Sequence, residues 1–71
     1  MRRYKVNIKF GKNVQRARKK LKISQEELAE KLNISRNHVG RIEKGRVNIT
    51  LVLIEKMART LKIKPSEIQP F

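Results

Sequence analysis

The sequence contains no cysteine and no aspartate, and it has a single histidine. Without cysteine the chain can form neither a disulfide framework nor a thiolate metal site, and we expect it to occupy a reducing cytoplasm. With no aspartate and no second histidine, other kinds of metal centre are also disfavoured. No apolar run approaches the roughly 18 residues of a membrane span, and the basic residues 1–10 lack the apolar segment of a signal peptide.

Catalytic machinery is missing as well. No nucleophile–base constellation and no glycine-rich phosphate loop can be recognised, so we expect neither an enzyme nor a cofactor, and no small-molecule ligand is evident. The chain is 71 residues long, which fits one domain. A domain of this size buries roughly 60% of the surface of its unfolded chain, which leaves little stability to spare.

Positive charge dominates the composition and is concentrated at one end. Lysine and arginine number 19 against six glutamates, which gives a net charge of +13. Residues 1–22 carry ten of these cations and no acid, whereas the remaining 49 residues have nine cations and all six glutamates. Such a one-sided field favours a polyanionic partner, nucleic acid before an anionic membrane. The alternative is a basic surface that serves only solubility.

Residues 1–10 alternate between apolar and polar side chains. The apolar members are Tyr4, Val6, Ile8 and Phe10. A period of two predicts a short β-strand. Such a strand could pair with its copy in a dimer, or the segment could be a basic arm that orders on DNA. The third alternative is a frayed terminus. We therefore separate residues 1–10 from a helical domain at residues 11–71.

The first two helices are predicted from periodicity and capping. A first helix is expected from about Lys12 to about Lys22. Its buried face would carry Val14, Ala17 and Leu21. A second helix starts at Ser24, because Ser24 and Glu27 have the spacing of a capping box. The buried stripe of this second helix would consist of Leu28, Ala29 and Leu32.

A tight turn connects the second helix to a third. Asn33 tolerates the left-handed backbone conformation that a helix end needs, Ile34 would fill the corner, and Ser35 can cap the next helix. The third helix is predicted to run to about Lys44, and Gly45 stops it. Two short helices joined by a tight turn, the second with a polar and cationic free face, are typical of a helix-turn-helix DNA reader.

Two further helical segments complete the predicted fold. Thr50 is placed to cap a fourth helix over residues 51–61, and Pro65 suits the first position of a short helical turn over residues 65–68. The core residues of this part are predicted to be Leu51, Ile54, Ala58, Leu61, Ile63 and Ile68. We therefore expect an all-α fold of five helices.

The third helix has a definite free face. At 100° per residue, Val39 and Ile42 point to one side. The residues on the opposite, free face are Arg36, Asn37, Gly40 and Arg41. Arginine can bond guanine and asparagine can bond adenine in the major groove, each contact being worth about 1–3 kcal/mol of discrimination. Gly40 either allows close approach to DNA or merely interrupts the helix, at a cost of about 1 kcal/mol.

Five further residues near this helix are candidates for contacts with DNA. His38 lies at the edge of the free face, where it either touches the DNA or is merely exposed. Lys44 and Arg46 suit phosphates, whereas Ser24 and Gln25 lie at a helix N-terminus, whose N–H groups favour an anion. Ser24 can cap its helix whether or not it also contacts a phosphate.

A set of residues spread over about residues 10–68 forms a recognisable pattern. Its members are Arg18, Ile23-Ser24-Gln25, Leu28-Ala29, Ser35, Ile42-Glu43, Gly45, Ala58, Leu61 and Ile63. This pattern resembles the phage repressor and Cro type of helix-turn-helix protein, also called the XRE family. The resemblance implies a compact five-helix domain of the lambda repressor type. Such domains are usually dimers that bind palindromic operators in double-stranded DNA to regulate transcription.

Positions carried across from the family assign roles to individual residues. The resemblance places base-reading contacts at Arg36, Asn37, His38 and Arg41. It places phosphate contacts at Gln25, Lys44 and Arg46. It also implies a partly buried ion pair between Arg18 and Glu43, which would join the first helix to the third.

Several positions depart from the family pattern. The family often has glycine at the position of Lys22 and proline at that of Ile49. Members commonly carry polar residues where this chain has Val52 and Leu53. Because three successive apolar residues cannot all face one core, Val52 or Leu53, together with Ile49, is a candidate for a twofold dimer contact. The alternative is that one of them is simply half buried.

Three functional hypotheses follow. The leading one is a dimeric regulator of the repressor or controller type that binds a specific DNA sequence. The alternative is an antitoxin that binds a protein toxin as well as its own promoter. A third, non-specific coating of nucleic acid or membrane, predicts no sequence preference and a steep salt dependence. That third function would not require Asn37 and Arg41 on a capped helix.

Overall fold

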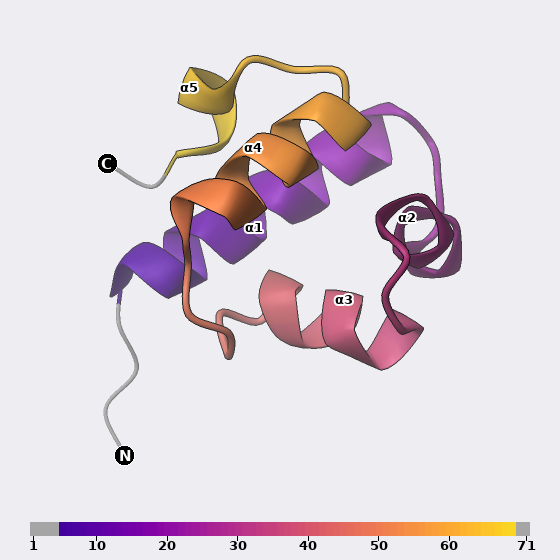
Figure 1. Ribbon diagram of the computed structural model, residues 1–71, viewed down its shortest axis with the longest axis horizontal. Coiled ribbons are helices and arrows are strands. Elements are labelled where there is room, and N and C mark those ends of the chain that lie inside the picture. The colour runs from indigo at the N-terminus through magenta and orange to yellow at the C-terminus, as the bar shows by residue number, and fades with distance from the viewer. Residues whose placement is uncertain (1–4, 70–71) are drawn as a thin grey trace.

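The computed structural model describes residues 5–69, which form five helices (Figure 1). They are α1 (Lys5–Lys20), α2 (Gln25–Leu32), α3 (Arg36–Glu43), α4 (Leu51–Thr60) and α5 (Pro65–Ile68). The described residues contain no strand, and the expected all-α fold of five helices is confirmed. Within the same residues, no helix is both long enough and apolar enough to span a membrane.

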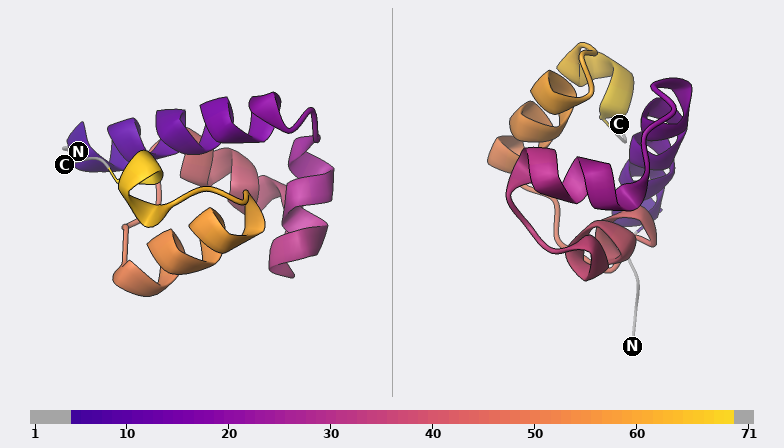
Figure 2. Two further views of the ribbon diagram at one scale, coloured as in Figure 1. Left: turned by 90° about the horizontal axis from the view of Figure 1, so that it is seen from above. Right: turned by 90° about the vertical axis from the view of Figure 1, so that its right-hand side faces the viewer.

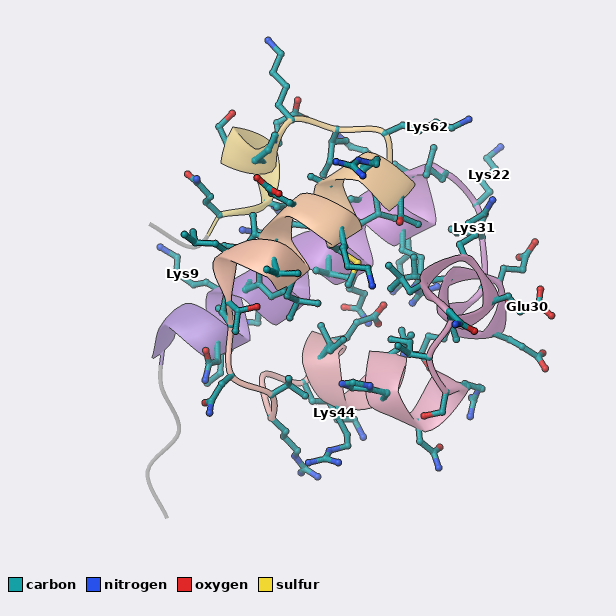
Figure 3. The ribbon with its side chains drawn as sticks, viewed as in Figure 1. Lys9, Lys22, Glu30, Lys31, Lys44 and Lys62 are labelled. Atoms are coloured by element: carbon teal, nitrogen blue, oxygen red, sulfur yellow. The ribbon has the colours of Figure 1, made fainter. Side chains whose placement is uncertain are left out.

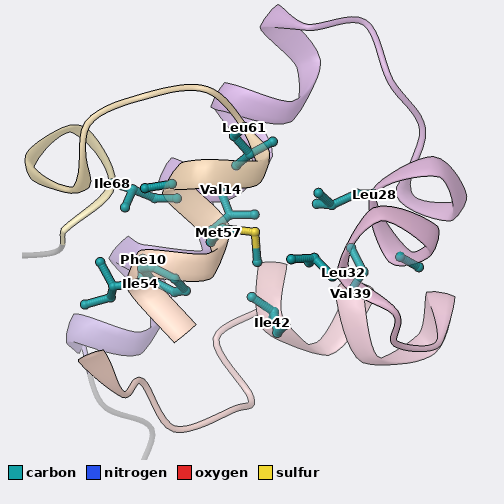
Figure 4. Packing of buried hydrophobic residues seen from close by; sticks show 12 residues of the cluster. Phe10, Val14, Leu28, Leu32, Val39, Ile42, Ile54, Met57, Leu61 and Ile68 are labelled. Atoms are coloured by element: carbon teal, nitrogen blue, oxygen red, sulfur yellow. The ribbon is translucent and has the colours of Figure 1, made fainter. Parts of the chain in front are cut away.

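The helices enclose one core. α1 and α4 lie on opposite sides of the molecule, and α2 closes one end (Figure 2). α3 lies along the bottom in the view of Figure 1, and α5 lies on the side away from α3. Every helix contributes side chains to the buried cluster (Figure 4). Its largest fully buried side chains are Phe10, Val14, Leu28, Val39, Ile42, Met57, Leu61 and Ile68.

Three of the helices end in the same way. Shortly after α1, α2 and α4, one residue takes a left-handed backbone conformation: Lys22 (φ 58°), Asn33 (φ 59°) and Lys62 (φ 60°). The next residue is always isoleucine, and its N–H donates to the carbonyl five residues earlier: Ile23 to Arg18 (3.4 Å), Ile34 to Ala29 (3.0 Å) and Ile63 to Ala58 (3.0 Å). Each isoleucine also packs against the core. Each helix end is therefore fixed by a hydrogen bond and by an apolar contact.

The predicted helix starts and stops are confirmed from the second helix onward. Ser24 Oγ accepts from the Glu27 N–H at 3.0 Å, and Glu27 Oε1 accepts from the Ser24 N–H at 2.8 Å, which is the predicted capping box. Ser35 and Thr50 cap α3 and α4, each with a hydroxyl that accepts a backbone hydrogen bond of 3.0 Å. Gly45 follows α3 with a φ of 74°.

The prediction for residues 1–10 is wrong in the part that the structure describes. Residues 5–10 are neither a strand nor a separate arm. They form the first turns of α1, which begins at Lys5 rather than near Lys12. The remainder of the predicted segment, residues 1–4, lies outside the described residues.

The reason is a helical periodicity that overlaps the alternating one. Asn7, Phe10 and Val14 are three and four residues apart, so they share one face of a helix. All three are buried in the structure. Ile8, which the alternating pattern placed beside Phe10, is only half-buried. Burial of Phe10 and Val14 on one helical face therefore outweighs the local strand preference.

Two predicted core residues are exposed. Leu21 is 41% exposed because it follows the last turn of α1, beyond the edge of the core. Leu51 is 76% exposed because it is the first residue of α4, and the helix turns it away from the core. The buried residues of α4 are Ile54, Met57 and Ala58. Met57, which is fully buried, was absent from the predicted stripe.

Two glycines allow backbone segments to approach one another closely. A Cβ atom at Gly11 of α1 would lie 2.5 Å from the carbonyl oxygens of Ile42 and Glu43. A Cβ atom at Gly45, where φ is positive, would lie 2.8 Å from the Cα of Ile8. The backbone of α1 and the C-terminal end of α3 are therefore in direct contact, which any side chain at these positions would prevent.

The substitution Gly11→Ala should destabilise the fold. The added methyl group meets main-chain oxygens, which cannot move aside as the end of a flexible side chain can, so α1 and α3 must separate. We expect the free energy of unfolding to fall by about 1–3 kcal/mol, the usual range for an overpacked interior. Urea denaturation measures this change.

Gly40→Ala is the matched control, because Gly40 also lies inside a helix. There a Cβ atom would approach nothing nearer than Gln25 Oε1 at 4.0 Å. The better helix propensity of alanine should raise the free energy of unfolding by up to about 1 kcal/mol. Equal shifts in the two variants would contradict the close packing of α1 on α3.

Candidate nucleic-acid interface

α3 is held by one face and exposed on the other. Val39 and Ile42 are buried, with at most 2% of their surface exposed. On the opposite face, Arg36, Asn37 and Arg41 are all exposed. The apolar contacts fix the rotation of α3 about its axis, so the direction of its polar side chains is fixed as well.

A hollow of about 410 Å³ lies against this exposed face. Its walls come from α2, α3 and the segment after α3, and consist of Gln25, Arg36, Asn37, Gly40, Arg41, Lys44 and Arg46. Four of these residues are cations, two are amides and none is acidic. Figure 3 shows Lys44 beside α3 at the lower edge of the molecule. The hollow combines positive charge with side chains that suit phosphates and base edges.

Six of the eight residues predicted to contact DNA line this hollow. The two that do not are His38, which is exposed outside it, and Ser24, whose hydroxyl caps α2. Gly40 lies in the wall, and α3 is continuous through it, so Gly40 does not interrupt the helix. No cluster of histidine, cysteine, aspartate or glutamate that could hold a metal ion occurs within residues 5–69.

A buried ion pair joins α1 to the end of α3. Arg18 Nε donates to Glu43 Oε2 at 2.6 Å, and Arg18 Nη2 donates to Glu43 Oε1 at 3.2 Å. The two side chains are only 10% and 2% exposed. Arg18 Nη1 also donates to the carbonyl oxygen of Ile23 at 2.9 Å. The pair implied by the family resemblance is present, and it has the bidentate geometry of strong arginine–carboxylate pairs.

Gln25 links this ion pair to the hollow. Its Nε2 atom donates to Glu43 Oε1 at 3.0 Å, while the side chain also lines the hollow. Sequence reasoning assigned Gln25 to a phosphate and missed this bond, because the partners are 18 residues apart and no local pattern joins them. An amide nitrogen carries two hydrogens, so Gln25 can bond Glu43 and still donate into the hollow.

Arg46 is positioned by the end of α3. Gly45 N–H donates to the Ile42 carbonyl at 3.1 Å, and Arg46 N–H donates to the Arg41 carbonyl at 2.9 Å. This is the hydrogen-bond pattern that ends α1, α2 and α4, but Arg46 stands where those helices have isoleucine. The position that elsewhere ties a helix end to the core here supplies a cation to the wall of the hollow.

The residues considered for dimer contact fall into two groups. Val52 is 67% exposed, whereas Ile49 and Leu53 are half-buried and pack against the core. Leu51, the neighbour of Val52, is also exposed. The exposed apolar pair at the start of α4 is therefore Leu51 and Val52.

Glu43→Ala should destabilise the protein strongly. It leaves the Arg18 guanidinium buried without its carboxylate, which typically costs about 3–5 kcal/mol of stability. The double variant Arg18→Met, Glu43→Leu removes both charges together, so it should lose less stability than Glu43→Ala. Thermal and urea melts of both variants measure the effect, and a Glu43→Ala melt that coincides with the wild type would exclude a stabilising pair.

Comparison with known proteins shows the family of this chain. The helix-turn-helix family model HTH_3 matches residues 14–68. The control protein C.MunI of a Mycoplasma species is 36% identical over 64 residues, which cover 89% of this chain and 86% of that protein. The control protein C.BamHI of Bacillus amyloliquefaciens is 33% identical over 67 residues, which cover 93% of this chain and 83% of that protein.

A solved structure shares both the fold and much of the sequence. The crystal structure of the restriction-modification controller protein C.AhdI from Aeromonas hydrophila matches with a TM-score of 0.83 and 38% identity, covering 92% of this chain and 98% of that one. The family resemblance seen in the sequence is confirmed. The chain belongs to the helix-turn-helix family of XRE, or Cro/C1-type, DNA-binding transcription regulators, which are not enzymes.

Proposed function

We propose that the protein binds a palindromic operator in double-stranded DNA as a homodimer, with α3 in the major groove, and acts as a regulator of the controller type. The observation that carries this proposal is the hollow on α3, which gathers four cations and two amides on one face. The names of the relatives support the controller role, since C.MunI and C.BamHI are control proteins and C.AhdI is a restriction-modification controller protein.

The base-reading residues in this proposal are Arg36, Asn37 and Arg41, with His38 at the edge. The first three are exposed on α3 and line the hollow. Arginine forms paired hydrogen bonds with guanine and asparagine does so with adenine. Gly40 lies among these residues and leaves open space above the helix, so a base edge or sugar can come close to the α3 backbone.

The phosphate-binding residues are Gln25, Lys44 and Arg46, with Ser24 at the N-terminus of α2. Lys44 and Arg46 are exposed at the end of α3, and Gln25 reaches the hollow from the first turn of α2. Contacts from two helices to one phosphate backbone fix the position of α3 without reading the sequence. The net charge of +13 adds long-range attraction for DNA.

The dimer contact in this proposal is the exposed apolar pair Leu51 and Val52. These residues are adjacent at the start of α4, with 76% and 67% of their surfaces exposed. A twofold contact between two copies of this patch would bury it, and the same axis would relate the two operator half-sites.

Selection of bound sequences from a random pool of DNA duplexes tests the proposal. We expect an inverted repeat with half-sites about 10 base pairs apart, centre to centre, or a multiple of that spacing. Recovery of no common sequence, or of a single asymmetric site, would contradict a dimeric operator-binding regulator.

Arg41→Ala should relax sequence preference at one position of each half-site. Loss of a paired contact to guanine costs about 1–3 kcal/mol for that base and leaves the others unchanged. Lys44→Ala is the comparison, because a lost phosphate contact should weaken all sequences alike and lower the salt slope by about 0.9. Binding to a panel of single-base operator variants distinguishes the two. A uniform loss in Arg41→Ala would make Arg41 a phosphate contact.

The double variant Leu51→Glu, Val52→Glu should be monomeric, because burying two carboxylates without partners is unfavourable. Both side chains are exposed, so the monomer fold should persist. Lys31→Gln, Lys62→Gln, on exposed positions of other segments, lowers the net charge by the same two units and controls for the change in charge. Light scattering gives the mass of each variant. A dimer that survives the Leu51→Glu, Val52→Glu change would place the interface elsewhere, and loss of the dimer in both variants would attribute the effect to charge alone.

A further inference from the structure

The outward face of α1 has no part in the function proposed above. Five cations occupy one side of this helix, within about 100° of its circumference. They are Lys9, Lys12, Arg16, Lys19 and Lys20, all of them exposed, and we call this set the α1 stripe. α1 contains no acidic residue.

The α1 stripe works against the stability of the helix that carries it. Lys12 and Arg16 are four residues apart, as are Arg16 and Lys20, and like charges at this spacing repel one another on a helix. The first turn of α1 has no acid to offset the positive end of the helix dipole. Among the described side chains, those of residues 7–69, the only ion pair joins Arg18 to Glu43, so none of these acids neutralises the stripe. A bound polyanion would relieve this repulsion.

The α1 stripe faces away from α3. Gly11 and Arg18 mark the side of α1 that contacts α3. The centre of the stripe lies roughly 130° around the helix from that side. Figure 2 shows α1 along one edge of the molecule, with α4 on the opposite edge, and Figure 3 shows Lys9 at the end of α1 far from α2. A straight duplex seated on α3 cannot also lie along the stripe.

We propose that the α1 stripe binds the phosphate backbone of a second DNA duplex, without sequence preference, while α3 holds the operator. The stripe from Lys9 to Lys20 extends about 16 Å along the helix axis. That length spans about five base pairs of a duplex, which carries one charge per ~1.7 Å of its axis. The row of cations and the row of phosphates are therefore opposite in charge and similar in length.

The composition of the stripe favours a duplex over other anionic partners. The apolar face of α1, with Phe10 and Val14, is buried in the core, so α1 has no apolar face to insert among lipids. The stripe also has no aromatic or apolar side chain to form the centre of a protein interface. Binding to backbone phosphates needs neither an apolar helix face nor an aromatic centre, because it is driven by release of counterions.

Two matched triple variants test the proposal. The stripe variant is Lys12→Gln, Arg16→Gln, Lys20→Gln. The control variant is Lys31→Gln, Lys56→Gln, Arg59→Gln, which removes three exposed cations from α2 and α4. Both variants lower the net charge equally, and both leave the wall of the hollow unchanged.

The first measurement is binding to a random-sequence duplex at a series of salt concentrations. Each phosphate contact contributes about 0.9 to the slope of log affinity against log salt. The stripe variant should therefore reduce the slope by roughly 2–3 relative to the control variant. The same reduction should be seen in an Arg36→Ala, Arg41→Ala background, so the outcome does not depend on operator recognition by α3.

The second measurement is bridging of two duplexes that carry different fluorescent labels. The wild type and the control variant should bring the two labels together, and the stripe variant should not. Equal slopes and equal bridging in the stripe and control variants would overturn the proposal. It would also be overturned if the wild type bound phosphatidylserine-containing vesicles more tightly than the duplex and the stripe variant lost this binding.

We do not expect unfolding to cause a loss of binding in the stripe variant. Glutamine has good helix propensity, and its substitution removes like-charge repulsion from α1. The stripe variant should therefore resist urea at low salt at least as well as the wild type. Its urea midpoint is measured alongside the binding.

Discussion

The buried carboxylate of Glu43 is the group on which the rest of the structure depends. A charge that is almost completely removed from water must be matched by donors, and Arg18 and Gln25 supply three hydrogen bonds to it. Arg18 belongs to α1 and Gln25 to α2, so one carboxylate near the end of α3 joins three helices. The relative placement of these helices is what brings Gln25, Arg41 and Arg46 to the wall of one hollow.

The parts of the fold that could be predicted are those with a local cause. Ser24, Ser35 and Thr50 cap helices because a hydroxyl three residues before a free N–H is sufficient, whatever the rest of the chain does. The free face of α3 follows from Val39 and Ile42 alone, because burial of one side of a helix fixes what the other side presents. The residues that line the hollow from α3 were therefore predictable before the hollow itself was known.

The parts that could not be predicted depend on contacts between distant segments. Phe10 fits a strand pattern and a helix pattern equally well, and only its burial among the other helices decides between them. Lys22 and Lys62 carry no residue-type signal for a left-handed conformation, which costs about 1–2 kcal/mol. The isoleucine after each one packs against the core and offsets that cost. The bond from Gln25 to Glu43 likewise exists only once α2 and α3 are packed.

The contact of Gly11 with the carbonyl oxygens of Ile42 and Glu43 has a consequence for recognition. The last turn of α3 is pressed on the backbone of α1 and its carboxylate is bonded on two sides, so tilting or sliding α3 to suit a different groove width would break these contacts. In the proposed complex, a mismatch in shape would then have to be accommodated by the nucleic acid. Base pairs that the protein never touches would influence affinity through their stiffness, and flexible pyrimidine–purine steps would be favoured wherever the duplex must bend.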